Sequence, residues 1–142
     1  SMFAKMNKVN ILIENNVVTK KNFDRFKSNP FLLTNYNDAK NFFKFMPKNV
    51  RLLVDVAHLK VSAKTEKLDP VKSLKIMNKY AEGYHFSDNN GDIDSNNPFR
   101  KNAWFLPYIK KNLNYYSIEV YNKSPSKLKS QINILKKELA IL

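Results

Sequence analysis

Four residues of metal-binding type recur along the chain, each in or near the end of a short apolar segment: Glu14, Asp55, His85 and Glu119. A charge buried at the end of an apolar strand is costly unless it is paired or bound to a metal ion. Three carboxylates and one imidazole form an oxygen-rich set that favours Mn²⁺, Mg²⁺ or Co²⁺ and also accepts Zn²⁺. These residue types therefore predict a site for one divalent cation.

Each of these residues also has an ordinary structural explanation. A carboxylate at a strand end more often caps the following loop or pairs with a lysine, and His85 between two aromatic residues fits a core histidine equally well. What favours a common site is their joint occurrence, one on each predicted strand and all at the same end.

The apolar segments that must position these residues are four predicted strands, 9–14, 51–55, 83–87 and 116–120. Helix-like stretches follow them at about 37–46, from 70 to about 80, more weakly around 104–111, and from Ser124-Pro125 onward. Asp69-Pro70 and Ser124-Pro125 are typical helix starts, and the last stretch carries a stripe of Leu128, Ile132, Leu135 and Leu139. We expect a polar loop after the first strand and a long loop after the second.

Strands that alternate with helices and are apolar almost throughout predict a parallel sheet covered by helices. The sequence has two glycines and no glycine-rich phosphate loop, which argues against a nucleotide-binding doubly wound fold. A full (β/α) barrel takes about 250 residues. We therefore predict that residues 1–142 form a single domain, a half barrel of the TIM type with four βα units. Dimerisation or a separate N-terminal half would complete it.

Composition narrows the classes of partner. The net charge of +13 is compatible with a polyanionic or phosphorylated ligand, but the lysines are spread through helical stretches, which favours a solvated surface. No apolar run approaches the roughly 20 residues that cross a bilayer, so we expect no membrane partner. The absence of cysteine excludes thiolate ligands and fits a reducing cytoplasm, the predicted location.

Four short motifs together resemble the xylose isomerase-like sugar isomerases and epimerases, which include the ketose 3-epimerases. The motifs are Ile13-Glu14-Asn15-Asn16, Val54-Asp55-Val56-Ala57-His58, His85-Phe86-Ser87-Asp88-Asn89 and Ile118-Glu119-Val120. The resemblance runs from about Val9 to the end of the chain and matches the C-terminal half of that barrel.

The resemblance implies a role for each matched residue. Glu14, Asp55, His85 and Glu119 would bind one divalent metal, and the two glutamates would also exchange a proton at the substrate carbon beside a carbonyl, through an enediolate. His58 would contact a substrate oxygen, and Asp88 is a second predicted substrate-binding residue. The expected ligand is a small sugar or sugar phosphate.

Several alternatives stay open at this point. Ketose epimerases often carry an arginine several residues after the matched histidine, and 87–91 has none, so the reaction extends to a dehydratase or lyase on the same barrel. Abasic-site endonucleases share the barrel, but their three-metal cluster needs more histidines than His58 and His85, which argues against nucleic acid as the partner. An inactive fragment or an assembly subunit is the non-enzymatic alternative, because a half barrel exposes two strand edges.

Overall fold

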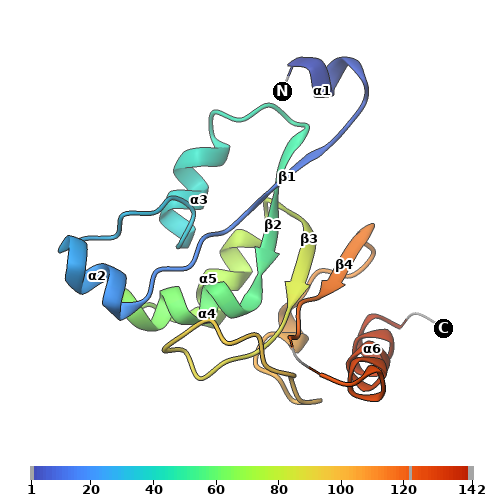
Figure 1. Cartoon of the computed structure of the whole chain (residues 1–142). Helices are drawn as coiled ribbons and strands as arrows, with labels where there is room; N and C mark the ends of the chain where they lie inside the picture. Colours follow the sequence, from blue (N-terminus) through green and yellow to red (C-terminus); the bar gives the residue numbers. More distant parts are fainter. Residues whose placement is uncertain (1, 122, 141–142) are drawn as a thin grey trace.

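The computed structural model describes residues 2–121 and 123–140 and has an α/β architecture around one four-stranded parallel sheet (Figure 1). The strands lie side by side in chain order and are β1 (Ile11–Glu14), β2 (Val50–Asp55), β3 (Ala81–Phe86) and β4 (Tyr115–Ile118). Every neighbouring pair is parallel. The predicted parallel sheet and its four strands are therefore confirmed.

Six α-helices and one 3-10 turn make up the described helical structure. They are α1 (Met2–Met6), α2 (Lys20–Phe26), α3 (Tyr36–Phe43), α4 (Val56–Thr65), α5 (Pro70–Met77), η1 (Leu106–Tyr108) and α6 (Pro125–Leu139). None of the helices in the described ranges is long and apolar enough to cross a membrane.

Alternation along the strands divides the sheet into two faces of different character. Leu52, Val54, Tyr84 and Phe86 lie on one face, in a buried cluster with helix residues such as Leu74. The opposite face carries the chemically active side chains and packs tightly near its centre. A Cβ added to Gly83 would lie 2.9 Å from the Tyr115 ring and 3.2 Å from Leu53, so this position in β3 accepts a larger residue only if its neighbours move.

The prediction of a long loop after the second strand is wrong, because α4 begins directly after β2. Asp55 is its N-cap and accepts a hydrogen bond from the backbone N–H of His58. Val56, Leu59 and Val61 are fully buried. Burial therefore stabilises a helix whose β-branched residues have only modest intrinsic helix propensity.

Two further expectations need correction. The predicted polar loop after the first strand contains α2, which begins after a Thr19–Asn22 capping box. The weak helix predicted around 104–111 is only the short turn η1, with Pro107 at its start. The helix predicted at 37–46 is present one residue earlier and ends at Phe43, while the helices starting at Pro70 and Pro125 are confirmed.

Candidate metal centre

The four residues singled out for metal binding converge at the carboxyl end of the sheet. Glu14 ends β1, Asp55 ends β2, His85 lies in β3, and Glu119 follows β4 directly. Each offers a ligand atom, and these atoms all lie within 4.8 Å of one another. The predicted convergence of the four side chains is therefore confirmed.

His85 is the centre of this cluster. Its Nδ1 lies 2.9 Å from Glu14 Oε1 and 3.1 Å from Glu119 Oε2. Two ligands that each sit about 2.1 Å from one octahedral cation at right angles are ~3 Å apart. The spacing of these donor atoms is therefore already close to that of neighbouring ligands around a divalent ion.

His85 and Glu14, which form the shortest contact in the cluster, change each other's pKa. The hydrogen bond from His85 lowers the pKa of Glu14, although burial acts in the opposite direction. The same hydrogen bond raises the pKa of His85, again against burial. In the metal-free chain, protonated His85 therefore supplies the positive charge between the two glutamates. A bound cation would supply this charge instead and would displace the proton.

Asp55 contributes the most deeply buried carboxylate. Its side chain is fully inaccessible, and burial raises its pKa to about 6. Oδ1 caps α4, whereas Oδ2 is buried without a hydrogen-bond partner among the described residues. A buried carboxylate oxygen without a partner carries a desolvation penalty that a bound cation would remove. The residues present therefore fit a divalent metal.

Asn15, which the sequence did not single out beyond its motif, fixes the position of Asp55. Its side chain accepts a hydrogen bond from the Asp55 N–H at 2.7 Å and donates to the Asp55 carbonyl at 3.1 Å. The side chain is fully buried. It continues the β1–β2 ladder beyond the strand ends and holds the Asp55 carboxylate in register with Glu14.

His58 lies beside the cluster on the first turn of α4 and is not one of the four converging residues. Its Nδ1 is 2.9 Å from the Asn15 carbonyl, and its Nε2 is 3.1 Å from Asp94 Oδ2. Both ring nitrogens face acceptors that have no proton to give, so the ring is protonated. Although burial opposes this charge, Asp94 and Asp55 raise the pKa of His58 to about 9.

Asp94 was missed as a site residue in the sequence, where it appears only as part of Asp92-Ile93-Asp94. Beside its contact with His58, its Oδ1 is buried without a hydrogen-bond partner among the described residues. No strand pattern points to it, because it lies in the loop after β3 and reaches the site only through the path of that loop.

The structure places Asp88 outside the four-residue cluster. Its carboxylate forms an ion pair with Lys60 at 2.7 Å, and its backbone bridges to Asn97. Lys60 also donates to the Asn89 carbonyl. These contacts anchor the loop after β3 onto α4, so substrate binding by Asp88 stays a prediction.

Two tyrosines that the sequence did not single out border the cluster. Tyr121 donates a hydrogen bond to Glu119 Oε1, leaving the other oxygen for His85. The Tyr115 hydroxyl lies 3.4 Å from His85 Nε2 and orients the ring from the side opposite to the glutamates, which contact Nδ1. Hydrogen bonds of this kind behind metal ligands set their orientation and basicity.

Comparison of the chain with known protein families, with curated proteins and with solved structures gives no match.

Proposed function

We propose that this chain provides the metal-binding half of a (β/α) barrel of the TIM type and acts as a divalent-metal-dependent isomerase or epimerase on a sugar or sugar phosphate. The observation that supports it is the convergence of Glu14, Asp55, His85 and Glu119 within 4.8 Å at the carboxyl ends of parallel strands. Enzymes built on this barrel carry their catalytic groups at that end.

The two glutamates fit the role of paired acid and base. They come from the two outermost strands and approach His85 from opposite sides along the sheet. A substrate carbon placed between them can lose its proton to one carboxylate and receive a proton from the other. In the metal-free chain the hydrogen bond from His85 lowers the pKa of Glu14, so this carboxylate is ionised before a cation or a substrate binds.

Asp55 and His85 fit the role of ligands without a proton-transfer function. One Asp55 oxygen caps α4 and the other is buried, so neither oxygen is placed to exchange a proton with the substrate. When bound, the cation supplies positive charge that stabilises the oxyanion formed beside the substrate carbonyl. Tyr121 keeps Glu119 in place while that residue exchanges its proton.

The experiment that tests this function is hydrogen exchange at carbon. The chain is incubated with Mn²⁺ in D₂O and a panel of ketoses and ketose phosphates, and deuterium incorporation beside the carbonyl is followed by NMR. We expect incorporation with at least one sugar, and a loss of at least about 100-fold in Glu14→Gln, the usual contribution of a general base.

The matched control is Asp92→Asn, which removes a carboxylate that is exposed and paired with Lys64. This variant keeps the wild-type exchange rate. Exchange that persists in Glu14→Gln removes Glu14 from the mechanism, and no exchange with any sugar in a chain that binds Mn²⁺ contradicts the proposed reaction.

A further inference from the structure

The candidate metal cluster connects the two outer strands of the sheet over one of its faces. In a flat sheet, neighbouring strands are about 4.8 Å apart, which puts the first and fourth strands ~14 Å apart. Yet Glu14 on β1 and Glu119 after β4 both lie within 3.1 Å of the same His85 nitrogen. The side chains of the two outer strands therefore reach toward each other over this face, which is the side that would line the inside of a closed barrel.

Among the described residues, both outer strands of the sheet have free edges. Within residues 2–121 and 123–140, β1 pairs only with β2, and β4 pairs only with β3. On β1, Ile11 and Asn15 donate their N–H groups toward β2, so the intervening N–H groups of Leu12 and Glu14 face outward. Unpaired strand edges of this kind are templates for a further strand.

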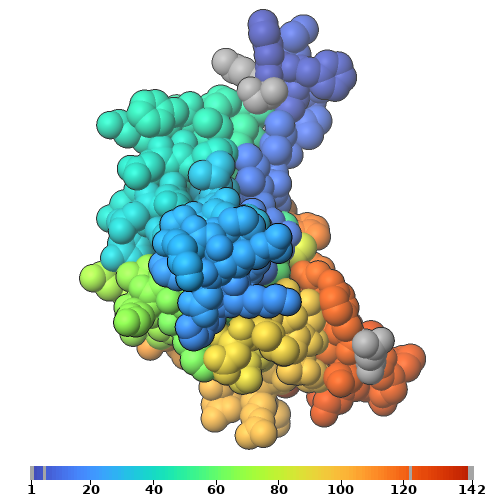
Figure 2. Space-filling view, turned by 60° about the vertical axis from the view of Figure 1, so that its left-hand side comes forward, coloured from blue at the N-terminus to red at the C-terminus, as the bar shows by residue number. Residues whose placement is uncertain are grey.

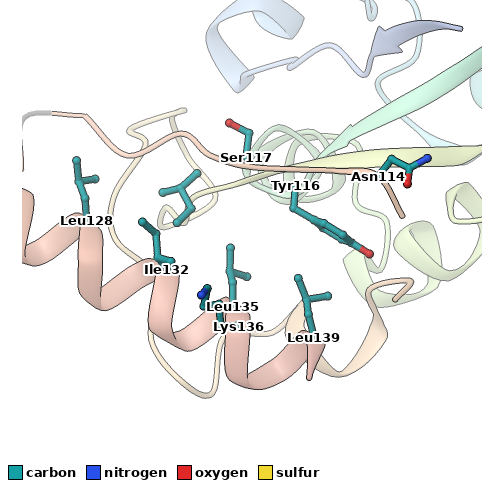
Figure 3. A pocket seen from close by; sticks show the side chains of 9 residues that line it. Asn114, Tyr116, Ser117, Leu128, Ile132, Leu135, Lys136 and Leu139 are labelled. Carbon is teal, nitrogen blue, oxygen red and sulfur yellow. The ribbon is translucent and has the colours of Figure 1, made fainter. Parts of the chain in front are cut away.

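An apolar groove runs along the β4 edge. It has a volume of about 550 Å³ and lies between β4 and α6 (Figure 3). The side chains of Leu128, Ile132, Leu135 and Leu139 point from α6 toward Tyr116 and Ser117. Ile132 remains 45% exposed, so the helix overhangs the strand without closing onto it.

The segment that leads into the N-terminal end of β1 presents exposed apolar side chains. Helix α1 leads into β1 and stands clear of the rest of the molecule (Figure 2). Its Met2, Phe3 and Met6 side chains are 76%, 81% and 77% exposed. Exposed apolar groups that gather at one place on a surface mark a contact site.

We propose that a second copy of this chain closes the barrel, with β1 of each copy pairing in parallel beside β4 of the other. The two edges belong to strands of equal length that run in the same direction, and one is flanked by an apolar groove while the other is flanked by exposed apolar side chains. A two-fold axis along the barrel generates two identical interfaces, each between β1 of one copy and β4 of the other. No strand edge is then left unpaired, so the assembly stops at two copies. The result is a closed barrel of eight parallel strands.

The charge of the chain adds a condition to this assembly. Each copy carries a net charge of +13, so two copies repel each other through solvent. Salt screens that repulsion, with a Debye length of about 10 Å at 0.1 M that falls to about 3 Å at 1 M. The apolar and backbone contacts are insensitive to this screening, so dimer formation strengthens as salt increases.

The test measures the mass in solution, by sedimentation and light scattering without added metal, for three variants. Ile132→Lys places a charge in the groove, and Leu12→Pro removes an outward N–H that β2 does not use. Asn133→Lys is the control, because it adds the same charge to the same helix at an exposed position outside the groove. Thermal melting verifies that each variant is folded.

We expect the wild type and Asn133→Lys to have twice the 16.6 kDa mass of the chain, and the two edge variants to be monomers. Mixing the two edge variants restores one intact interface, because the groove of Leu12→Pro meets the β1 edge of Ile132→Lys. A mixed dimer therefore forms. Phe3→Lys, which changes only an exposed α1 side chain, weakens the dimer without any change in the strands.

A wild-type chain that stays monomeric at high concentration and high salt overturns the proposal. So does a dimer that both edge variants leave intact, and so does open-ended growth beyond two copies. Because the measurement is made without metal, its failure leaves the proposed metal site unaffected.

Discussion

At the scale of single residues, the two histidines of the chain lie in different electrostatic settings. His85 lies among carboxylates that a cation can bind, whereas His58 faces Asp94 and the Asn15 carbonyl. Its protonated ring holds the loop after β3 against the end of β1. His58 thus fits a fixed positive charge beside the metal centre, and a substrate oxygen is a natural partner for such a charge.

This setting predicts a pH dependence of stability. The pKa of His58 is raised from 6.5 to about 9, so the stability it contributes is fully present below pH 6.5 and is lost as pH rises through 9. We expect the free energy of unfolding in urea, measured with EDTA present, to fall by on the order of 2 kcal/mol across this window. In Asp94→Asn the fall is largely abolished, whereas Asp92→Asn keeps it. Equal profiles for all three chains would contradict the assignment.

At the scale of elements, Asp55 has two structural roles, one at the end of a strand and one at the start of a helix. It ends β2 as a candidate metal ligand and precedes α4 as its N-cap. Asn15 completes this junction by binding both backbone groups of Asp55 from the neighbouring strand. The position of the carboxylate is therefore set by strand pairing, by helix capping and by burial together.

The two tasks can be separated by substitution. Asn is as good an N-cap as Asp, so Asp55→Asn should keep α4 and the metal-free stability while losing the charge that binds the cation. Asp55→Ala loses both, and its metal-free unfolding free energy should be lower by about 1 kcal/mol. Chemical denaturation with EDTA, beside Mn²⁺ titration, distinguishes the two variants. A destabilised Asp55→Asn that still binds Mn²⁺ would reverse the assignment.

The strands, the order of the sheet and the convergence of Glu14, Asp55, His85 and Glu119 could be predicted from the sequence, because apolar runs define strands and parallel strands bring their carboxyl ends to one edge. Helix α4 could not, since its polar and apolar residues are intermixed around the helix and show no clear amphipathic period. Asp94 and Tyr121 lie outside the regular elements and were also missed. Their positions depend on loop paths that no short-range pattern encodes.

At the scale of the whole molecule, one four-stranded parallel sheet carries the polar cluster at its carboxyl end. The four candidate ligands lie in or directly after the four strands of one chain, so the cluster itself contains no residue of a partner. A closed barrel would instead shield that site from bulk water and strengthen the electrostatic interactions within it. Metal binding and barrel closure are thus separate properties, and the first is the basis of the proposed chemistry.

Titration of the metal-free chain with Mn²⁺, followed by calorimetry and by electron paramagnetic resonance, is the most direct test. We predict one Mn²⁺ per chain, a higher melting temperature with metal because the ion binds only the folded state, and at least about a 100-fold weaker affinity in His85→Ala and Glu119→Gln. Asp92→Asn should bind like the wild type. A melting temperature unchanged by millimolar Mn²⁺, or binding that survives in His85→Ala and Glu119→Gln, would show that the four residues do not hold a cation.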